Sequence, residues 1–266
     1  MSPDTRLATT NVSSAEHKRA WDCFQQVYFV HAAAIEAFRL LHSLPDAASQ
    51  LGVSIQTRHG FGTNYRPGWP LAMAESLLEG TQRDAATGFQ TIRFSALIAV
   101  CAAFEYLVKA RFVDAAIADE ESASALLSSK KLSVKLDLVE VLGLPASEQW
   151  FVIADELFKK AGDGGKSMSE RVKYMLFDCI KMVDVEHSQR QQQFLEAVTD
   201  KFNLAFLVRH CFVHNGGRVN RTLSRAVGRQ IGTEILMSDP EFLGLIAAVR
   251  KVAEAAAHPY WLLSLE

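Results

Sequence analysis

The sequence predicts an all-α protein, a compact helical bundle with an N-terminal helical extension. Three observations support this fold class. Apolar residues recur at three- and four-residue spacing through most of the 266 residues, which is the period of an amphipathic helix. The Asn-Gly-Gly of residues 215–217 and the Ser-Asp-Pro-Glu of residues 238–241 are typical helix stop and start signals. Residues 231–237 suggest at most a short strand or an extended link.

The N-terminal half is expected to contain three helices. The first begins near Ser14 and ends at Pro45, and a glycine- and proline-rich loop follows at residues 58–70. A short helix then ends at Gly80. A core helix follows from about Arg83 to Ala118. Its predicted buried face consists of Phe94, Leu97, Ile98, Cys101, Phe104, Leu107 and Val108.

The C-terminal half is expected to contain the remaining helices. Amphipathic segments lie at residues 132–142 and 147–160, and a glycine loop follows at 162–165. Further helices are predicted at 171–183, at 186–213, which is the longest, and from Pro240 to about His258. We therefore divide the chain into a disordered tail (1–14), an N-terminal helical extension (15–82) and a helical domain (83–262).

Charge and cysteine content limit the possible functions. A formal net charge of −2 excludes a generally basic nucleic-acid-binding surface, so a polyanion would have to meet a local patch. The four cysteines are scattered without a C-x-x-C pair, which is typical of buried thiols in a reducing compartment. We see no secretory signal, and the apolar window 94–104 is shorter than the ~20 residues of a membrane span. The sequence therefore predicts a cytoplasmic location.

The candidate site lies at the end of the longest predicted helix. His210 and His214 are four residues apart and share a helix face, and the long side chain of Arg209 can reach the same place. The terminal carbonyls favour a protonated imidazole by roughly 0.3 to 1 kcal/mol. Cleaving RNA without a metal requires a base, an acid and positive charge on the phosphorane, which this set can supply. Two copies meeting across a two-fold axis would let His214 of each chain take one role.

A run of basic residues follows the motif. No acidic residue occurs between Asp200 and Glu234. If this segment is helical, one face carries Arg218, Arg221, Arg225 and Arg229. Such a face either follows a phosphate backbone or is simply solvated, and the pattern supports both interpretations equally.

The segment from Arg209 to His214, followed by Asn215-Gly-Gly, resembles the R-x4-6-H motif of the HEPN superfamily, in the form of its RiboL-PSP-HEPN-like branch. Upstream, Phe94 to Phe112 with Glu105 resembles the first core helix of that family. The likeness covers roughly residues 83–258. It implies a helical bundle that dimerises, with Arg209 and His214 as the catalytic pair, His210 in the polar motif position and Asn215 beside them.

The resemblance also implies a function. We expect a metal-independent endoribonuclease of a toxin–antitoxin, abortive-infection or related defence type, which leaves a 2′,3′-cyclic phosphate. The expected partners are RNA, a second copy of the chain and, as a candidate, an antitoxin, with no membrane and no cofactor. Arg218, Arg221, Arg225 and Glu105 are the expected substrate contacts. The alternative is an inactive HEPN-like module that binds RNA or another protein without cutting.

Other sites are less well supported by the pattern. His210 and His214 have the helical spacing of zinc ligands, but the spacing supplies no third ligand and Arg209 would repel a cation. The glycine-rich segment 161–167 lacks the first glycine of a phosphate-binding loop and follows a predicted helix instead of a strand. Cys211 has no separate orienting acid that would make it a nucleophile.

Overall fold

The computed structural model describes residues 69–119, 141, 143–179 and 185–257, together with 32–37, 39, 40 and scattered further positions between 22 and 53 and at 121 and 124. The described residues form α-helices joined by turns, which confirms the predicted fold class. One isolated β-bridge, between Arg218 and Glu234, occurs where a short strand was expected, and no strand forms among the described residues. The helices are α4 (Trp69–Ala86), α5 (Gln90–Ala118), α8 (Ala146–Ala161), α9 (Met168–Lys173), α10 (Val185–Asn215), α11 (Arg221–Val227) and α12 (Asp239–Ala257).

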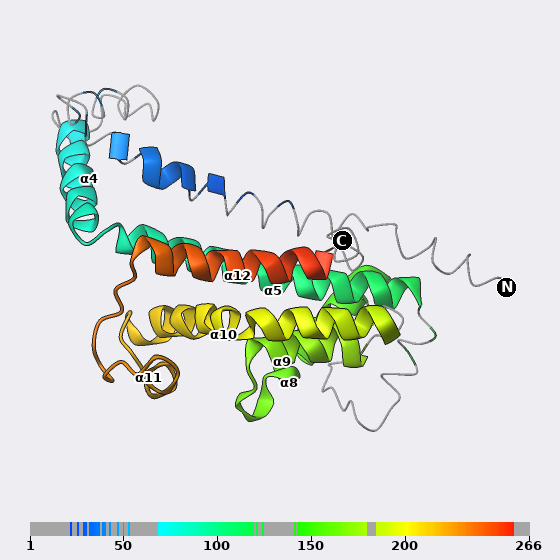
Figure 1. Ribbon diagram of the computed structural model, residues 1–266. Helices are drawn as coiled ribbons and strands as arrows, with labels where there is room; N and C mark the ends of the chain where they lie inside the picture. The colour runs from blue at the N-terminus through cyan, green and yellow to red at the C-terminus, as the bar shows by residue number, and fades with distance from the viewer. Residues whose placement is uncertain are drawn as a thin grey trace.

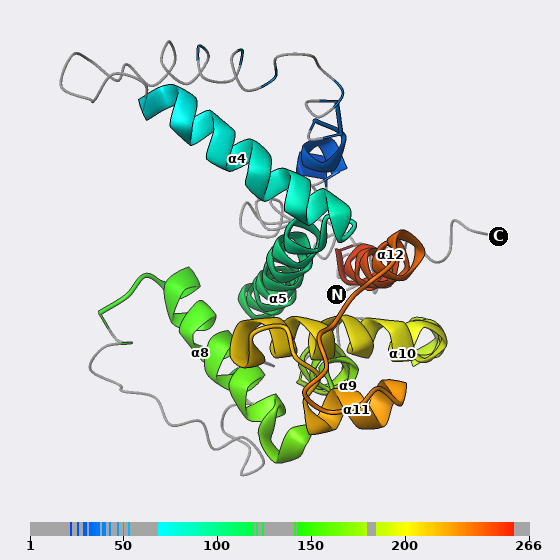
Figure 2. The same cartoon turned by 90° about the vertical axis from the view of Figure 1, so that its left-hand side faces the viewer.

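Helix α5 is the centre of the bundle. It packs against α8, α10 and α12, and Figures 1 and 2 show α12 beside it and α10 beneath it. Among the described helices, α5 is long and apolar enough to cross a membrane, but 56% of its most apolar window is buried inside the bundle. A helix that is apolar on most sides suits the core of a helical protein.

Aromatic contacts define how α5 and α10 pack. Phe104 on α5 meets Phe202 and Phe206 of α10 edge to face, at ring-centroid distances of 5.2 and 5.8 Å. Near the start of α5, Phe94 stacks on Phe212, close to the end of α10. The two helices are therefore antiparallel, and the end of α10 lies beside the beginning of α5.

The start of α5 differs from the prediction. A single helix from Arg83 to Ala118 is wrong, because α4 continues to Ala86 and α5 begins only at Gln90. Gly88 and Phe89 between them have φ of 80° and 59°, which no helix accommodates. The carboxylate of Asp84 accepts hydrogen bonds from the backbone N–H of Thr91 and of Ile92 and so caps α5. Figure 1 shows α4, on the N-terminal side of this break, projecting from the bundle.

Other boundaries follow the sequence signals. The predicted capping box at Ser238 is confirmed, because Ser238 N–H donates to Glu241 and Glu241 N–H donates back to the Ser238 hydroxyl. Helix α8 spans the predicted segment 147–160. The helix expected at 171–183 begins earlier, as α9, and continues as a π-helical turn from Tyr174 to Cys179.

The predicted buried face of the core helix is largely confirmed. Phe94, Leu97, Cys101, Phe104, Leu107 and Val108 are all buried, whereas Ile98 is half-buried. Most of the helix expected from Ser14 to Pro45, and of the segment 132–142, lies outside the described residues. Within the first of these, Ile35 is buried against the bundle.

Candidate functional site

The motif lies at the C-terminal end of α10, and the predicted glycine stop is confirmed. The helix ends at Asn215, and Gly216 and Gly217 both adopt the left-handed conformation, with φ of 59° and 76°. The N–H of Gly217 donates to the carbonyl of Cys211, six residues earlier, at 3.2 Å. A Cβ at Gly217 would lie only 2.6 Å from the ring of Phe212, so the close approach also requires glycine.

The residues of the motif divide between the core and the surface. Cys211 is completely buried, and Phe212 packs on Phe94 of α5. His210, Val213 and His214 are exposed. This division follows from the helical period, because anchoring Cys211 and Phe212 in the core turns positions 210, 213 and 214 outward.

The two imidazoles form a surface pair. Their ring centroids lie 4.6 Å apart, with the planes tilted by 46°. Partial burial lowers the pKa of His210 below its ordinary value of 6.5, and the neighbouring charges of His214 and Arg209 lower it further. His210 is therefore neutral near pH 7, in the form that accepts a proton.

Arg209 lies in the seam between α10 and α5. One of its terminal nitrogens is 3.7 Å from Oε1 of Glu105, and the two side chains are only 26% and 22% exposed. Its Nε is buried without a hydrogen-bond partner among the described residues. The guanidinium is thus anchored on one side by Glu105, while its charge still acts on His210.

Glu105, which was expected among the substrate contacts, lies against Arg209. The pair adjoins the buried thiol of Cys101, whose pKa is raised far above its ordinary value by burial. Cys101 is therefore a neutral packing residue. Because Glu105 offsets part of the charge of Arg209, the site is less positive than the sequence run alone suggests.

The expected stripe of four arginines does not form. Helix α11 contains only Arg221 and Arg225, both exposed, because Gly228 ends it at φ 70°. Arg218 precedes the helix and donates to the carbonyl of Gly232 at 3.1 Å. Arg229 follows it and pairs with Glu241 at 3.3 Å.

Backbone pairing explains why this segment is not one continuous helix. The N–H of Val219 donates to Thr233 O at 2.9 Å, and the N–H of Gly232 donates back to Val219 O at 2.8 Å. The N–H of Ile235 also reaches Gly217 O, at 2.9 Å. These bonds fold the chain back on itself around α11, beside the end of α10.

Sequence reasoning missed the two acidic partners, Glu105 of Arg209 and Glu241 of Arg229. Glu105 lies far from the basic run in the sequence, and only the packing of α10 against α5 brings it near. Glu241 lies on α12, just after the run, and meets Arg229 because the chain folds back after α11. For the metal alternative, no group of three or more His, Cys, Asp or Glu side chains gathers anywhere in the described part of the chain. The glycine-rich segment 161–167 comes at the end of α8 and contains a 3-10 turn, Asp163–Gly165. A helix therefore precedes this segment, as predicted, and not the strand that precedes a phosphate-binding loop.

Comparison with protein-family models, with curated proteins and with solved structures finds no match to this chain.

Proposed function

We propose that this protein is a metal-independent endoribonuclease whose site lies at the end of α10. The observation that carries the proposal is the surface pair of His210 and His214, with rings 4.6 Å apart, next to an anchored arginine. Two imidazoles at this separation can serve one phosphodiester as base and acid. Arg209 supplies a permanent charge with planar donor geometry suited to phosphate oxygens.

The proposed reaction is an internal transfer within the RNA. Neutral His210 takes the proton of the 2′-hydroxyl, whose oxygen attacks the adjacent phosphorus. The bond from phosphorus to the 5′-oxygen then breaks, and His214, acting as the acid, gives a proton to that leaving oxygen. Arg209 stabilises the charge on the phosphorane. The products are a 2′,3′-cyclic phosphate and a free 5′-hydroxyl, so no water, metal or cofactor enters this step.

A homodimer is part of the proposal. A two-fold axis near the end of α10 would bring a second Arg209 and a second His214 to the same cleft. Exposed Val213, 47% accessible between the two histidines, and Ile231, 57% accessible, supply apolar surface near the same end of the molecule. In the cell, the resemblance favours a cytoplasmic toxin–antitoxin or phage-defence role, with an antitoxin as candidate partner.

Cleavage and binding measured on the same variants test the proposal. His214→Ala and Arg209→Ala should lower the rate of cutting of a single-stranded ribo-oligonucleotide in chelator by about 100-fold or more. Arg83→Ala is the matched control, because Arg83 is 79% exposed on α4 and, among the described residues, pairs with Glu79 of its own helix. Equal losses in all three variants, or none in any, would contradict the assignment.

The second candidate is an RNA-binding module without catalysis. The contact of Arg209 with Glu105 favours it, because a charge held in an ion pair is less available to a phosphorane. Exposed Arg221 and Arg225 would still bind phosphates. This module would bind the oligonucleotide in the assay above, and neither the wild type nor any variant would cut it.

A further inference from the structure

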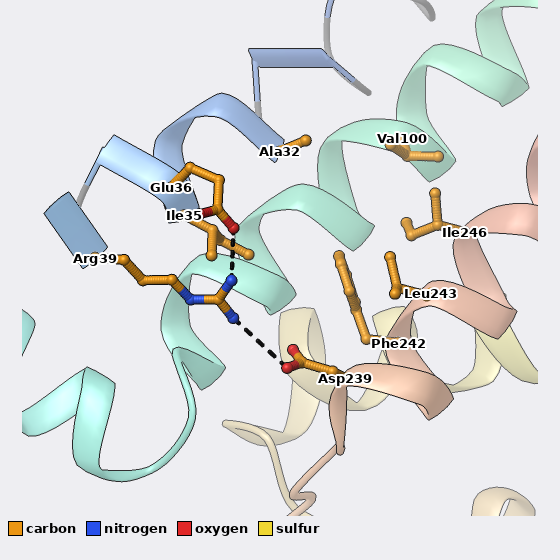
Figure 3. Close-up of a pocket in the computed structure, with 9 residues that line it drawn as sticks. All are labelled: Ala32, Ile35, Glu36, Arg39, Val100, Asp239, Phe242, Leu243 and Ile246. Carbon is orange, nitrogen blue, oxygen red and sulfur yellow. Dashed lines mark hydrogen bonds and ion pairs between the residues drawn. The ribbon is translucent and has the colours of Figure 1, made fainter.

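A pocket of about 260 Å³ lies between the N-terminal segment, α5 and α12 (Figure 3). Six of its nine lining residues are apolar, among them Ile35, Val100, Phe242 and Leu243. Its polar residues are Glu36, Arg39 and Asp239. A small cavity with apolar walls and a few polar groups at one side is the usual form of a small-molecule site.

The polar side of the pocket has one cation, Arg39, and two carboxylates, Glu36 and Asp239, with unequal contacts. Buried Arg93, whose side chain is 4% exposed, forms a close ion pair with Asp239 and donates to the carbonyl of Met237 at 2.7 Å. The negative charge of Asp239 is thus already balanced by buried Arg93. Its second oxygen is 3.6 Å from Arg39, which is longer than a hydrogen bond.

Arg39 therefore has one strong partner and one weak one. Its NH1 donates to Glu36 at 2.5 Å, while its NH2 faces Asp239 across the pocket mouth, as Figure 3 shows. An incoming carboxylate can replace Asp239 as the partner of the Arg39 NH2 group. Asp239 would still have a cationic partner, because its ion pair with Arg93 is kept. A cationic head group gains less, because both carboxylates already have a guanidinium partner.

We propose that this pocket binds a small monocarboxylate with an apolar body. The carboxylate would take the NH2 edge of Arg39, and the body would lie against Val100, Phe242 and Leu243. The N-terminal segment that lines the pocket lies on the side of α5 and α12 away from α10 (Figure 2), so the proposal does not depend on the ribonuclease assignment.

Isothermal titration calorimetry of the full chain with octanoate tests this site. Octanoate should bind saturably, and 1-octanol and octylamine should bind about tenfold more weakly or worse, because each lacks the charged acceptor for Arg39. Arg39→Gln should weaken octanoate binding by about tenfold. Arg83→Gln, which removes an exposed arginine paired with a glutamate on α4, should leave it unchanged.

A second variant tests the cavity separately from the charge. Leu243 is 57% exposed at the pocket, so Leu243→Trp fills the space without disturbing the core and should abolish octanoate binding. Loss in Arg39→Gln and Leu243→Trp, with retention in Arg83→Gln, supports the site. Absent or non-saturable binding, equal binding of octanol or octylamine, or octanoate affinity unchanged in either pocket variant would overturn it.

Discussion

At the residue scale, Gly217 shows how a single position fixes the end of α10. Its φ of 76° is strained for any side chain, and a Cβ would meet the ring of Phe212 at 2.6 Å. Gly216 also has a positive φ, of 59°, but a Cβ there would meet nothing within 4 Å. A side chain at Gly216 would therefore meet backbone strain alone, whereas a side chain at Gly217 would meet backbone strain and a steric clash.

Alanine at each position should reveal this difference. Gly216→Ala should lower the free energy of unfolding by about 1 to 2 kcal/mol, which is the cost of the left-handed conformation. Gly217→Ala should cost more than that, because Phe212 and the stacked Phe94 must also move. Urea unfolding of both variants measures the difference. Equal losses would contradict the close approach to Phe212.

His210 should make stability depend on pH. Its pKa is lowered in the folded chain, so below its ordinary value of 6.5 the unfolded chain binds more protons and the free energy of unfolding falls. Well above that pH the His210 imidazole is neutral in both the folded and the unfolded chain, and the effect disappears. Because the ring is exposed, solvent screening keeps the effect small, at most about 2 to 4 °C in Tm.

Melting curves near pH 7.5 and near pH 5.5 check this expectation. The wild type should lose more Tm on acidification than His210→Gln does. If acidification lowers the Tm of the wild type and of His210→Gln equally, His210 is not the group responsible.

Residue patterns predicted only part of the candidate site. The helical spacing correctly indicated that His210 and His214 share a face, because that relation is local in the chain. The contact of Arg209 with Glu105 joins positions 104 residues apart, and depends on how α10 packs against α5. No local pattern encodes this contact, and the expectation that Glu105 also meets substrate stays a prediction.

At the scale of elements, α11 carries the two arginines that remain available for a phosphate backbone. Arg221 and Arg225 are one turn apart and exposed, whereas Arg229 is tied to Glu241. The double change Arg221→Gln with Arg225→Gln should weaken binding of a single-stranded RNA. It should also reduce the slope of log affinity against log salt concentration by about 1.4.

Salt titrations in a His214→Ala background, which keeps the RNA intact, measure this slope. Arg229→Gln is the control and should change the slope less, because its charge is already compensated. If the double variant keeps the wild-type slope, α11 does not contact the phosphates.

The break between α4 and α5 shows where element boundaries escape the sequence. The apolar period continues through residues 83–93, so it predicted one helix. The break depends on Phe89, a bulky residue with positive φ, and on the capping of α5 by Asp84. Gly88 was the available signal, but a lone glycine inside a helical pattern does not by itself mark a boundary.

At the scale of the whole molecule, the proposal includes a homodimer that brings a second Arg209 and a second His214 to the site. Light scattering coupled to gel filtration should give a mass of twice the 29.4 kDa of one chain. An exposed-face variant, Val213→Glu, should shift the protein toward the monomer and lower cleavage with it, since Val213 lies beside His214 at the proposed axis. If the monomer cleaves RNA as fast as the wild type, the mechanism does not require a dimer.

The overall architecture was the most predictable property. A chain with 49% hydrophobic residues at helical spacing has few ways to bury its apolar faces other than a bundle. The pocket between residues 32–39 and α12 was not predictable, because its walls come from three segments distant in sequence. Its polar side depends on Arg93 and Asp239 meeting across the bundle.

The most direct test of the central claim is the chemistry of the cut end. Single-stranded RNA incubated with the wild type in excess chelator should yield fragments that end in a 2′,3′-cyclic phosphate by mass spectrometry, and His214→Ala should yield none. Intact RNA with the wild type, cutting that requires a metal, or the same fragments from His214→Ala would contradict the account.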